Sequence, residues 1–164
     1  MDAEASSSLR RLLAERPVAA LATLHQGEPA VSMVPFVLPA GAAHVVIHVS
    51  ALATHTRDML AHPRVGLLVM AQCSADVSPQ ACPRVSLQAD AEHVPPDADG
   101  HAEARAHYLA RFPDAAVTFE LADFSIFILR PVSARLIAGF GRAGSLVGEP
   151  LREWLQVTAA DRAG

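Results

Sequence analysis

The chain has 164 residues, of which 51% are hydrophobic and 18% charged, and its formal net charge is −4 at neutral pH. A chain of this length and composition can bury a sizeable core, so we expect one domain over residues 1–164 and exclude wholesale disorder. The thirteen basic residues are all arginine and are scattered along the sequence, which argues against a nucleic-acid-binding surface. Because there is no lysine, an enzyme that forms a Schiff base through lysine and a nucleotide-binding Walker loop are both excluded. No run is apolar enough to span a bilayer and no signal-peptide pattern opens the chain, so we expect a cytoplasmic protein that engages no membrane.

The first part of the chain predicts a helix and a strand hairpin. Residues 6–15 are amphipathic, with a serine at the start and Pro17 after the end, inside an N-terminal helical segment 1–16. Residues 18–25 and 30–38 alternate like strands and are joined by the turn QGEP. Pro35 cannot donate to a strand ladder, so we expect the second strand at a sheet edge or beside a ligand.

The middle of the chain predicts a strand over residues 44–50, a helix over 51–61 ended by Pro63, and strands over 64–70 and 82–94. Cys73 and Cys82 belong to the connection between the last two strands. In a cytosolic chain we expect them to be reduced thiols, and a zinc site would need more ligands than they supply.

The last part predicts a helix over residues 102–111, stopped by Pro113, and two strands over 123–131 and 133–141 that are near enough in sequence to pair. Gly148 and Pro150 interrupt the segment after these strands, and a short helix closes a C-terminal helix-and-tail segment, 150–164. Strands joined mostly by short turns, with few helices between them, predict a mainly β, α+β fold: an antiparallel barrel or sheet with helices outside.

Polar side chains gather where the strand 44–50 passes into its helix. Free backbone N–H groups and the helix dipole make a helix start a ready anion site, and hydroxyl, imidazole and guanidinium groups can all donate to phosphate oxygens. The alternative is an N-capped surface helix with a solvated arginine. The candidate phosphate-binding residues are Ser50, Thr54, His55, Thr56 and Arg57.

Other motifs point less clearly to chemistry. The run GFGRAG, residues 139–144, matches a dinucleotide-binding fingerprint by letter but lacks the following helix, so its glycines are expected to permit a sharp turn or a close backbone approach. Arg142 within it could reach a ligand or only solvent. No hydrolase signature is present, the acids form no evident pair, and a structural hydrogen bond is the expected role of His48.

Four blocks in this order resemble the FMN-binding split-barrel proteins related to pyridoxamine 5'-phosphate oxidase, and more closely the haem-utilisation branch of that superfamily. The blocks are residues 30–38, 49–69, 106–116 and 123–146. The second and fourth are the specific ones. The resemblance implies a six-stranded antiparallel split β-barrel with peripheral helices, and a homodimer with FMN at the subunit interface.

The resemblance also implies site residues. It places the FMN phosphate at the strand-to-helix block already described. The flavin ring is implied to lie against Ser32, Met33, Val34 and Pro35, with Arg84 and Ser86 of a later strand contributing polar groups.

The function implied by this resemblance is an FMN-dependent oxidoreductase acting on a small-molecule substrate, in which the flavin carries the redox chemistry. Two alternatives stay open: a haem-binding or haem-utilisation protein on the same barrel, and a flavin carrier or sensor without turnover. The haem-binding relatives are implied to use a histidine near the C-terminus as iron ligand, and this chain has no histidine after His107.

Overall fold

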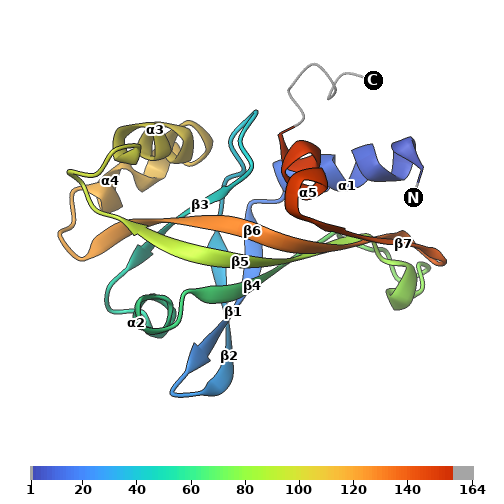
Figure 1. Ribbon diagram of the computed structural model, residues 1–164, viewed down its shortest axis with the longest axis horizontal. Coiled ribbons are helices and arrows are strands. Elements are labelled where there is room, and N and C mark those ends of the chain that lie inside the picture. The colour runs from blue at the N-terminus through green and yellow to red at the C-terminus, as the bar shows by residue number, and fades with distance from the viewer. Residues whose placement is uncertain (1, 157–164) are drawn as a thin grey trace.

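One curled antiparallel sheet forms the centre of the molecule (Figure 1). The computed structural model describes residues 2–156, and within them seven strands pair in the order β2-β1-β4-β5-β6-β3, with β7 added beside β6. Every pairing between these strands is antiparallel, as the sequence predicted. The strands are β1 (Val18–His25), β2 (Glu28–Pro35), β3 (Val45–Ser50), β4 (Arg64–Met70), β5 (Arg84–Val94), β6 (Phe124–Gly139) and β7 (Arg142–Val147).

Helices lie around the sheet and not within it. The helices α1 and α5 lie side by side in Figure 1, and the indole N–H of Trp154 on α5 donates to the Ser6 hydroxyl on α1 at 2.8 Å. The helices α3 and α4 cover another region, and α2 lies near β1. The helices are α1 (Ala3–Glu15), α2 (Thr54–Ala61), α3 (His101–Arg111), α4 (Ala116–Phe119) and α5 (Gly148–Leu155), with 3-10 turns at Pro79–Ala81 and Pro113–Ala115.

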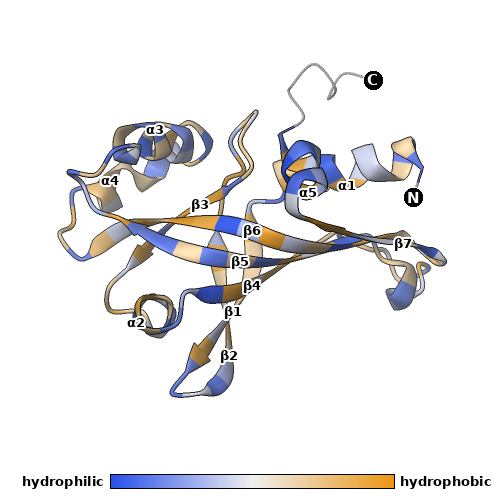
Figure 2. Ribbon diagram, in the orientation of Figure 1, coloured by the Kyte–Doolittle hydropathy of each residue, from blue (hydrophilic) through white to orange (hydrophobic). Residues whose placement is uncertain are grey.

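Strand alternation divides the sheet into two faces. Along β5 hydrophobic and hydrophilic residues alternate in Figure 2, and the buried positions alternate with the more exposed ones over most of the strand. The inner face packs Leu21, Ile47 and Leu67 against Leu9 of α1 and Leu151 of α5 in one core. This burial of apolar area is the main stabilising contribution to the fold.

A second core lies under α3, where Tyr108 and Ala104 pack against Val46, Ile126 and Ile128. Since Val46 and Ile126 alternate along β3 and β6 with residues of the first core, these two strands are covered on both faces.

Several predicted boundaries differ from the structure for local reasons. The helix after β3 begins at Thr54 and not at residue 51, because Ala51 donates its N–H to the Asp123 carbonyl at 2.6 Å and stays in the turn. The predicted serine cap of α1 is wrong: the Asp2 carboxylate accepts from the Ala5 N–H at 2.8 Å instead. The first strand turn is shorter than predicted, since Gln26 and Gly27 alone connect β1 and β2 with φ angles of 54° and 88°.

The two strands predicted over 123–131 and 133–141 are one strand, β6. Its first half pairs with β3, its second half with β7, and β5 runs along both. A register shift between Gln88 and Ala89 of β5 lies opposite Pro131, so the strand continues past a residue that cannot donate. Gly148 and Pro150 do not precede the last helix but lie in its first turn, where an N–H has no partner within the helix. Residues 157–164 of the predicted C-terminal helix-and-tail segment lie outside the described residues.

The cysteine prediction is wrong. Cys73 and Cys82 form a disulfide, with Cα atoms 6.0 Å apart. The β4–β5 hairpin brings the two ends of this loop together, and the Ala71 N–H donates to the Pro83 carbonyl at 2.9 Å beside it. Spacing in the sequence does not reveal that proximity, which satisfies disulfide geometry.

Two predictions, one of an edge strand and one of a turn, are confirmed. β2, which ends at Pro35, is the edge strand next to β1. The glycine run closes the β6–β7 hairpin, where Gly139 and Gly141 have φ angles of 155° and 71° that favour glycine.

Arg111 joins α3 to the end of α1. Its guanidinium donates to the carbonyls of Ala14, of Glu15 at 2.9 Å and of Arg16 at 2.8 Å, which are carbonyls at the C-terminal end of α1.

We expect Arg111→Met to lower the free energy of unfolding by about 2–3 kcal/mol, because it removes a charged donor shared by three carbonyls. Urea denaturation followed by circular dichroism measures the change. Arg111→Lys keeps the charge but not the forked donors and should recover only part of the loss. Arg105→Met, on the same helix, is the control; equal effects at the two positions would contradict this role of Arg111.

Candidate functional site

The predicted phosphate-binding hydroxyls bind the protein itself. The Ser50 hydroxyl donates to the Asp123 carboxylate at 2.8 Å and accepts from the Leu52 N–H at 3.1 Å. The Thr56 hydroxyl donates to the Ser50 carbonyl at 2.7 Å, and Thr56 is only 2% exposed. These bonds fix the turn between β3 and α2, and they place a carboxylate next to Ser50.

The first turn of α2 has other donors. Among the described residues no side chain caps the start of α2, and the Thr56 N–H donates to the Ala53 carbonyl at 3.2 Å. Thr54 is exposed, and the Nε2 atom of His55 is buried without a hydrogen-bond partner among the described residues. Burial lowers the pKa of His55, which favours its neutral form at physiological pH.

Arg57 faces a cleft and not the turn that Ser50 and Thr56 fix. The cleft has a volume of about 560 Å³ and opens between the end of β1, the β1–β2 turn and one side of α2. Its lining residues are Leu24, His25, Gln26, Arg57, Asp58, Ala61 and His62.

A buried carboxylate organises this cleft. Asp58 is 4% exposed, accepts a hydrogen bond from the Thr23 hydroxyl at 2.8 Å and is paired with His25 Nδ1 at 2.8 Å. The hydrogen bond from His25, together with that from Thr23, holds the pKa of Asp58 below its usual value although burial acts in the other direction. Because an ionised carboxylate can only accept, Nδ1 of His25 carries a proton, and in the neutral ring the lone pair lies on Nε2.

The predicted ring-binding residues of β2 divide between the two faces of the sheet. Val34 is 1% exposed in the core, and the Ser32 hydroxyl on the same inner face is buried without a partner among residues 2–156. Met33 points outward and is 62% exposed, while Pro35 is half-buried.

Register defines an outer face that crosses five strands. Ala20 lies opposite both Met33 and Leu68, Leu68 lies opposite Ser86, and Ser86 lies opposite Arg135. In the next row, Ala22 lies opposite both Val31 and Gly66, Gly66 lies opposite Gln88, and Gln88 lies opposite Ser133. We call this surface the outer face; its residues are Ala20, Ala22, Val31, Met33, Gly66, Leu68, Ser86, Gln88, Ser133 and Arg135.

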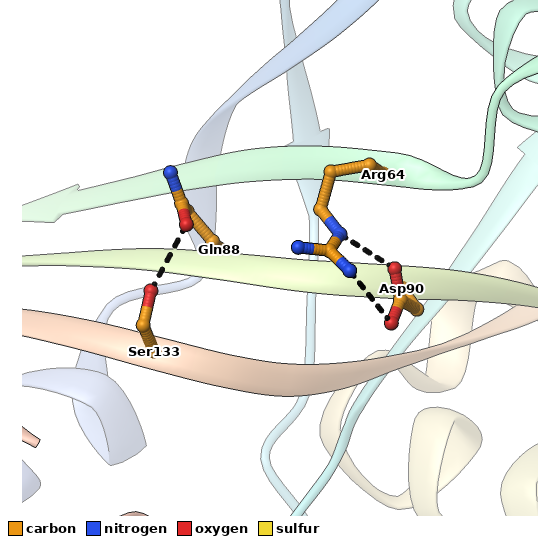
Figure 3. Close-up of polar contacts among 4 residues, drawn as sticks. All are labelled: Arg64, Gln88, Asp90 and Ser133. Atoms are coloured by element: carbon orange, nitrogen blue, oxygen red, sulfur yellow. Dashed lines mark hydrogen bonds and ion pairs between the residues drawn. The ribbon is translucent and has the colours of Figure 1, made fainter. Parts of the chain in front are cut away.

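The outer-face residues named above are apolar on β1, β2 and β4 and polar on β5 and β6, and the charged pair of Arg64 and Asp90 lies in the next row on β4 and β5. Figure 3 shows the contacts of Arg64 with Asp90 and of Ser133 with Gln88. The Arg64 guanidinium donates two hydrogen bonds to the Asp90 carboxylate, at 2.6 and 3.2 Å, and the Ser133 hydroxyl donates to the Gln88 side-chain oxygen at 3.1 Å. These cross-strand pairs lie on β4, β5 and β6.

The remaining predicted residues lie apart. Met33 and Ser86 share a row of the outer face, but Arg84 donates to the carbonyls of Gln80 at 3.3 Å and Cys82 at 2.9 Å. Arg142 binds both oxygens of the Asp2 carboxylate, at 3.1 and 3.0 Å. The structure therefore brings together Ser50 with Thr56, whereas Met33 and Ser86 are separated by Ala20 and Leu68 of the two strands between them.

Sequence reasoning missed the group formed by Thr23, His25 and Asp58. It found no evident pair among the acids and gave His25 no role. The strand pattern contained a signal, because Thr23 and His25 are two polar residues on the same face of an otherwise apolar strand. Polar side chains buried on such a face need hydrogen-bond partners.

His48 has the structural role that was predicted. It is 6% exposed, its ring stacks on Phe119 with centroids 3.7 Å apart, and the Thr118 hydroxyl lies 3.4 Å from Nδ1. Burial, with smaller contributions from the positive charges of His101 and Arg105, lowers the pKa of His48 to about 4.

Within residues 2–156 no three His, Cys, Asp or Glu side chains are arranged to hold a metal ion. None of the helices described is long and apolar enough to cross a membrane.

An antiparallel sheet curled into a half-barrel, with helices at its periphery, defines a split-barrel protein. Residues 6–138 match the family described as pyridoxamine 5'-phosphate oxidase, and the chain belongs to that family. The predicted resemblance and split-barrel fold are thereby confirmed, and β7 is a seventh strand added to the six that the resemblance implied.

Similar proteins lie in the haem-utilisation branch. The chain is 32% identical over 137 residues to the chloroplastic heme oxygenase HOZ of Arabidopsis thaliana, covering 84% of this chain and 40% of that protein. It is 29% identical over 150 residues to heme oxygenase HutZ of Vibrio cholerae, covering 90% of this chain and 84% of that protein. The structure of a heme binding protein from Mycobacterium smegmatis matches with a TM-score of 0.80 at 34% identity, over 93% of this chain and 62% of that one.

The pKa of His48 predicts a pH-dependent stability. The folded pKa of about 4 lies below the ordinary value of 6.5, so between these values the unfolded chain binds a proton that the folded chain does not. We expect the free energy of unfolding to fall as the pH drops from about 6.5 to about 4 and this contribution to level off below. Denaturation at a series of pH values checks this, and His48→Phe should remove that part of the slope. If the variant keeps the same dependence of stability on pH, groups other than His48 cause that dependence.

Proposed function

We propose that this protein binds haem. The observation that carries the proposal is the similarity, over 84% and 90% of the chain, to two proteins named heme oxygenases. The solved relative with a TM-score of 0.80, named a heme binding protein, supports it further.

The cleft supplies some of the groups that a haem needs, but only two apolar side chains. A haem needs an axial donor to iron, apolar contact for the macrocycle and cationic groups for its propionates. The cleft has imidazoles at His25 and His62, a guanidinium at Arg57, and apolar side chains at Leu24 and Ala61. Its volume of about 560 Å³ is within the range of small-molecule sites.

Bound haem would supply the redox and oxygen chemistry of its iron. The protein's own residues would orient the group, hold its carboxylates and limit the access of water.

A second candidate is an FMN-binding oxidoreductase, or a flavin carrier without turnover. The observation in its favour is the first turn of α2, where uncapped N–H groups lie beside a His55 whose Nε2 has no partner among the described residues. Against it, the Ser50 and Thr56 hydroxyls already donate within the protein, and Asp123 would repel a phosphate near Ser50.

One titration separates the two. We expect haemin added to the purified protein to give a shifted Soret band that saturates at one haem per chain, with a Kd of about 1 µM or tighter, or about −8 kcal/mol. FMN added in parallel should show no saturable quenching of its fluorescence. Saturable FMN binding with no Soret shift would replace the haem proposal by the flavin one. Loss of the Soret band after a reductant and oxygen are added would indicate haem breakdown in addition to binding.

We also propose that the protein is a homodimer joined through its outer face. Val31 and Met33 are 74% and 62% exposed on that face, and Met70 next to it is 41% exposed. Contiguous apolar surface of this kind is typical of an interface, and a two-fold dimer pairs the same patch on both subunits.

Multi-angle light scattering is expected to give a mass of twice 17.3 kDa for the native chain, and Val31→Asp combined with Met33→Asp should convert it to a monomer. Two carboxylates facing their copies across the interface would be desolvated and would repel each other. Val117→Asp, at a 72% exposed position on α4, is the control. A native monomer at micromolar concentration would refute the dimer.

A further inference from the structure

We infer that the cleft beside α2 binds a small carboxylic acid that also carries a hydroxyl group. Arg57 holds the carboxylate of this ligand, and His25 accepts the hydrogen bond of its hydroxyl. A haem macrocycle needs apolar contact over most of its surface, whereas Leu24 and Ala61 are the two apolar residues in the lining of the cleft. The cleft therefore suits a small polar ligand, and this inference goes beyond the proposed binding of haem and does not depend on it.

The negative charge of Asp58 is already used by the protein. One carboxylate oxygen accepts from the Thr23 hydroxyl and the other pairs with Nδ1 of His25, both at 2.8 Å, and the residue is 4% exposed. Glu28 lies opposite His25 in the β1–β2 register but does not line the cleft. Arg57 lines the cleft and makes no ion pair within the described part of the chain. The charge left for a ligand is thus positive.

The form of this charge favours a carboxylate. A planar guanidinium binds a carboxylate by two parallel hydrogen bonds, so Arg57 alone can satisfy both oxygens of such a group. A phosphate has more oxygens and needs further donors, whereas the nearby ring nitrogen of His25 is an acceptor in the neutral imidazole.

The tautomer of His25 determines which group fits beside the carboxylate. Since Nδ1 donates to the ionised Asp58, the neutral ring has its lone pair on Nε2. The side chain is 45% exposed and lines the cleft, so this nitrogen can accept a hydrogen bond from a ligand hydroxyl. An ammonium group could donate as well, but the charge of Arg57 would repel it, so a hydroxy acid fits better than an amino acid.

Gln26 gives the cleft a further polar group. Its φ angle of 54° lies in the left-handed region, where two-residue hairpin turns favour asparagine or glycine. The turn itself therefore does not favour glutamine. Because Gln26 lines the cleft, we assign its amide to a second hydrogen bond with the ligand, in keeping with the occurrence of such backbone conformations at ligand sites.

Isothermal titration calorimetry of the full chain with three acids tests the inference. Succinate, malate and aspartate share one carbon skeleton and differ at one carbon, which carries a hydrogen, a hydroxyl or an ammonium group. We expect one enantiomer of malate to bind about 3–10-fold more tightly than succinate, the contribution of one neutral hydrogen bond, and aspartate to bind more weakly than succinate. Equal affinities for the three acids and inorganic phosphate would indicate a general anion site and overturn the inference, as would no heat of binding at millimolar concentration.

Two variants locate the ligand in the cleft. Arg57→Gln removes the charge and should weaken the binding of malate and succinate alike by about tenfold or more. Arg152→Gln, at an exposed arginine of α5, is the control and should change neither affinity. His25→Asn keeps a side-chain N–H for Asp58 but has no atom at the position of Nε2, so it should abolish the preference for malate and leave the affinity for succinate unchanged.

Gln26→Gly separates binding from folding. Glycine adopts the left-handed conformation readily, so the melting temperature should not fall, yet malate binding should weaken by about 3–10-fold because the amide is lost. Unchanged affinities in Arg57→Gln would overturn the site, and a retained preference for malate in His25→Asn would overturn the role of His25. Neither result bears on haem binding, which the Soret titration measures separately.

Discussion

The cleft depends on one buried charge, the Asp58 carboxylate. An ionised carboxylate taken out of water is costly unless it is paired and hydrogen-bonded, and here a hydroxyl and an imidazole from the same strand satisfy both oxygens. These two bonds fix the rotation of α2 about its own axis, because no other orientation of the helix brings Asp58 to Thr23 and His25. The neighbouring Arg57 and the residue that ends the helix, His62, are thereby directed to the cleft. The geometry of a short helix of eight residues is thus set by a polar contact as well as by the buried Met59.

The two faces of the sheet have different roles. The inner face is closed by α1 and α5, whose apolar residues complete the core. No helix among residues 2–156 covers the outer face in this way. The middle of that face consists of Ala20, Ala22 and Gly66, and a Cβ added to Gly66 would lie 3.5 Å from that of Ala22. Small side chains in the middle, with larger ones on either side, make a shallow surface that a flat partner can approach closely.

Much of the fold could be predicted because it depends on local patterns. Alternation of apolar residues identified the strands from residue 18 to 94, and Pro35 and the glycines at 139 and 141 marked an edge and a turn. The continuity of β6 could not be predicted, because a proline normally ends a ladder and only the shifted register of β5 accommodates it. At the site, the composition of the first turn of α2 predicted donors for an anion, but not that Ser50 and Thr56 would use theirs within the turn. The pairing of Asp58 with His25 joins residues 33 positions apart, and only the packing of helix on strand decides it.

The bond between Cys73 and Cys82 has a consequence for electrostatics at the end of the sheet. It closes a small covalent ring whose carbonyls, at Gln80 and Cys82, accept from the Arg84 guanidinium. A thiol reductant would open that ring into two cysteines and relax the backbone that holds these acceptors, while the Ala71–Pro83 hydrogen bond would still close the hairpin. The positive charge of Arg84 would then be free to turn toward solvent. The surface potential of this end of the barrel is in this way coupled to the thiol balance of its surroundings.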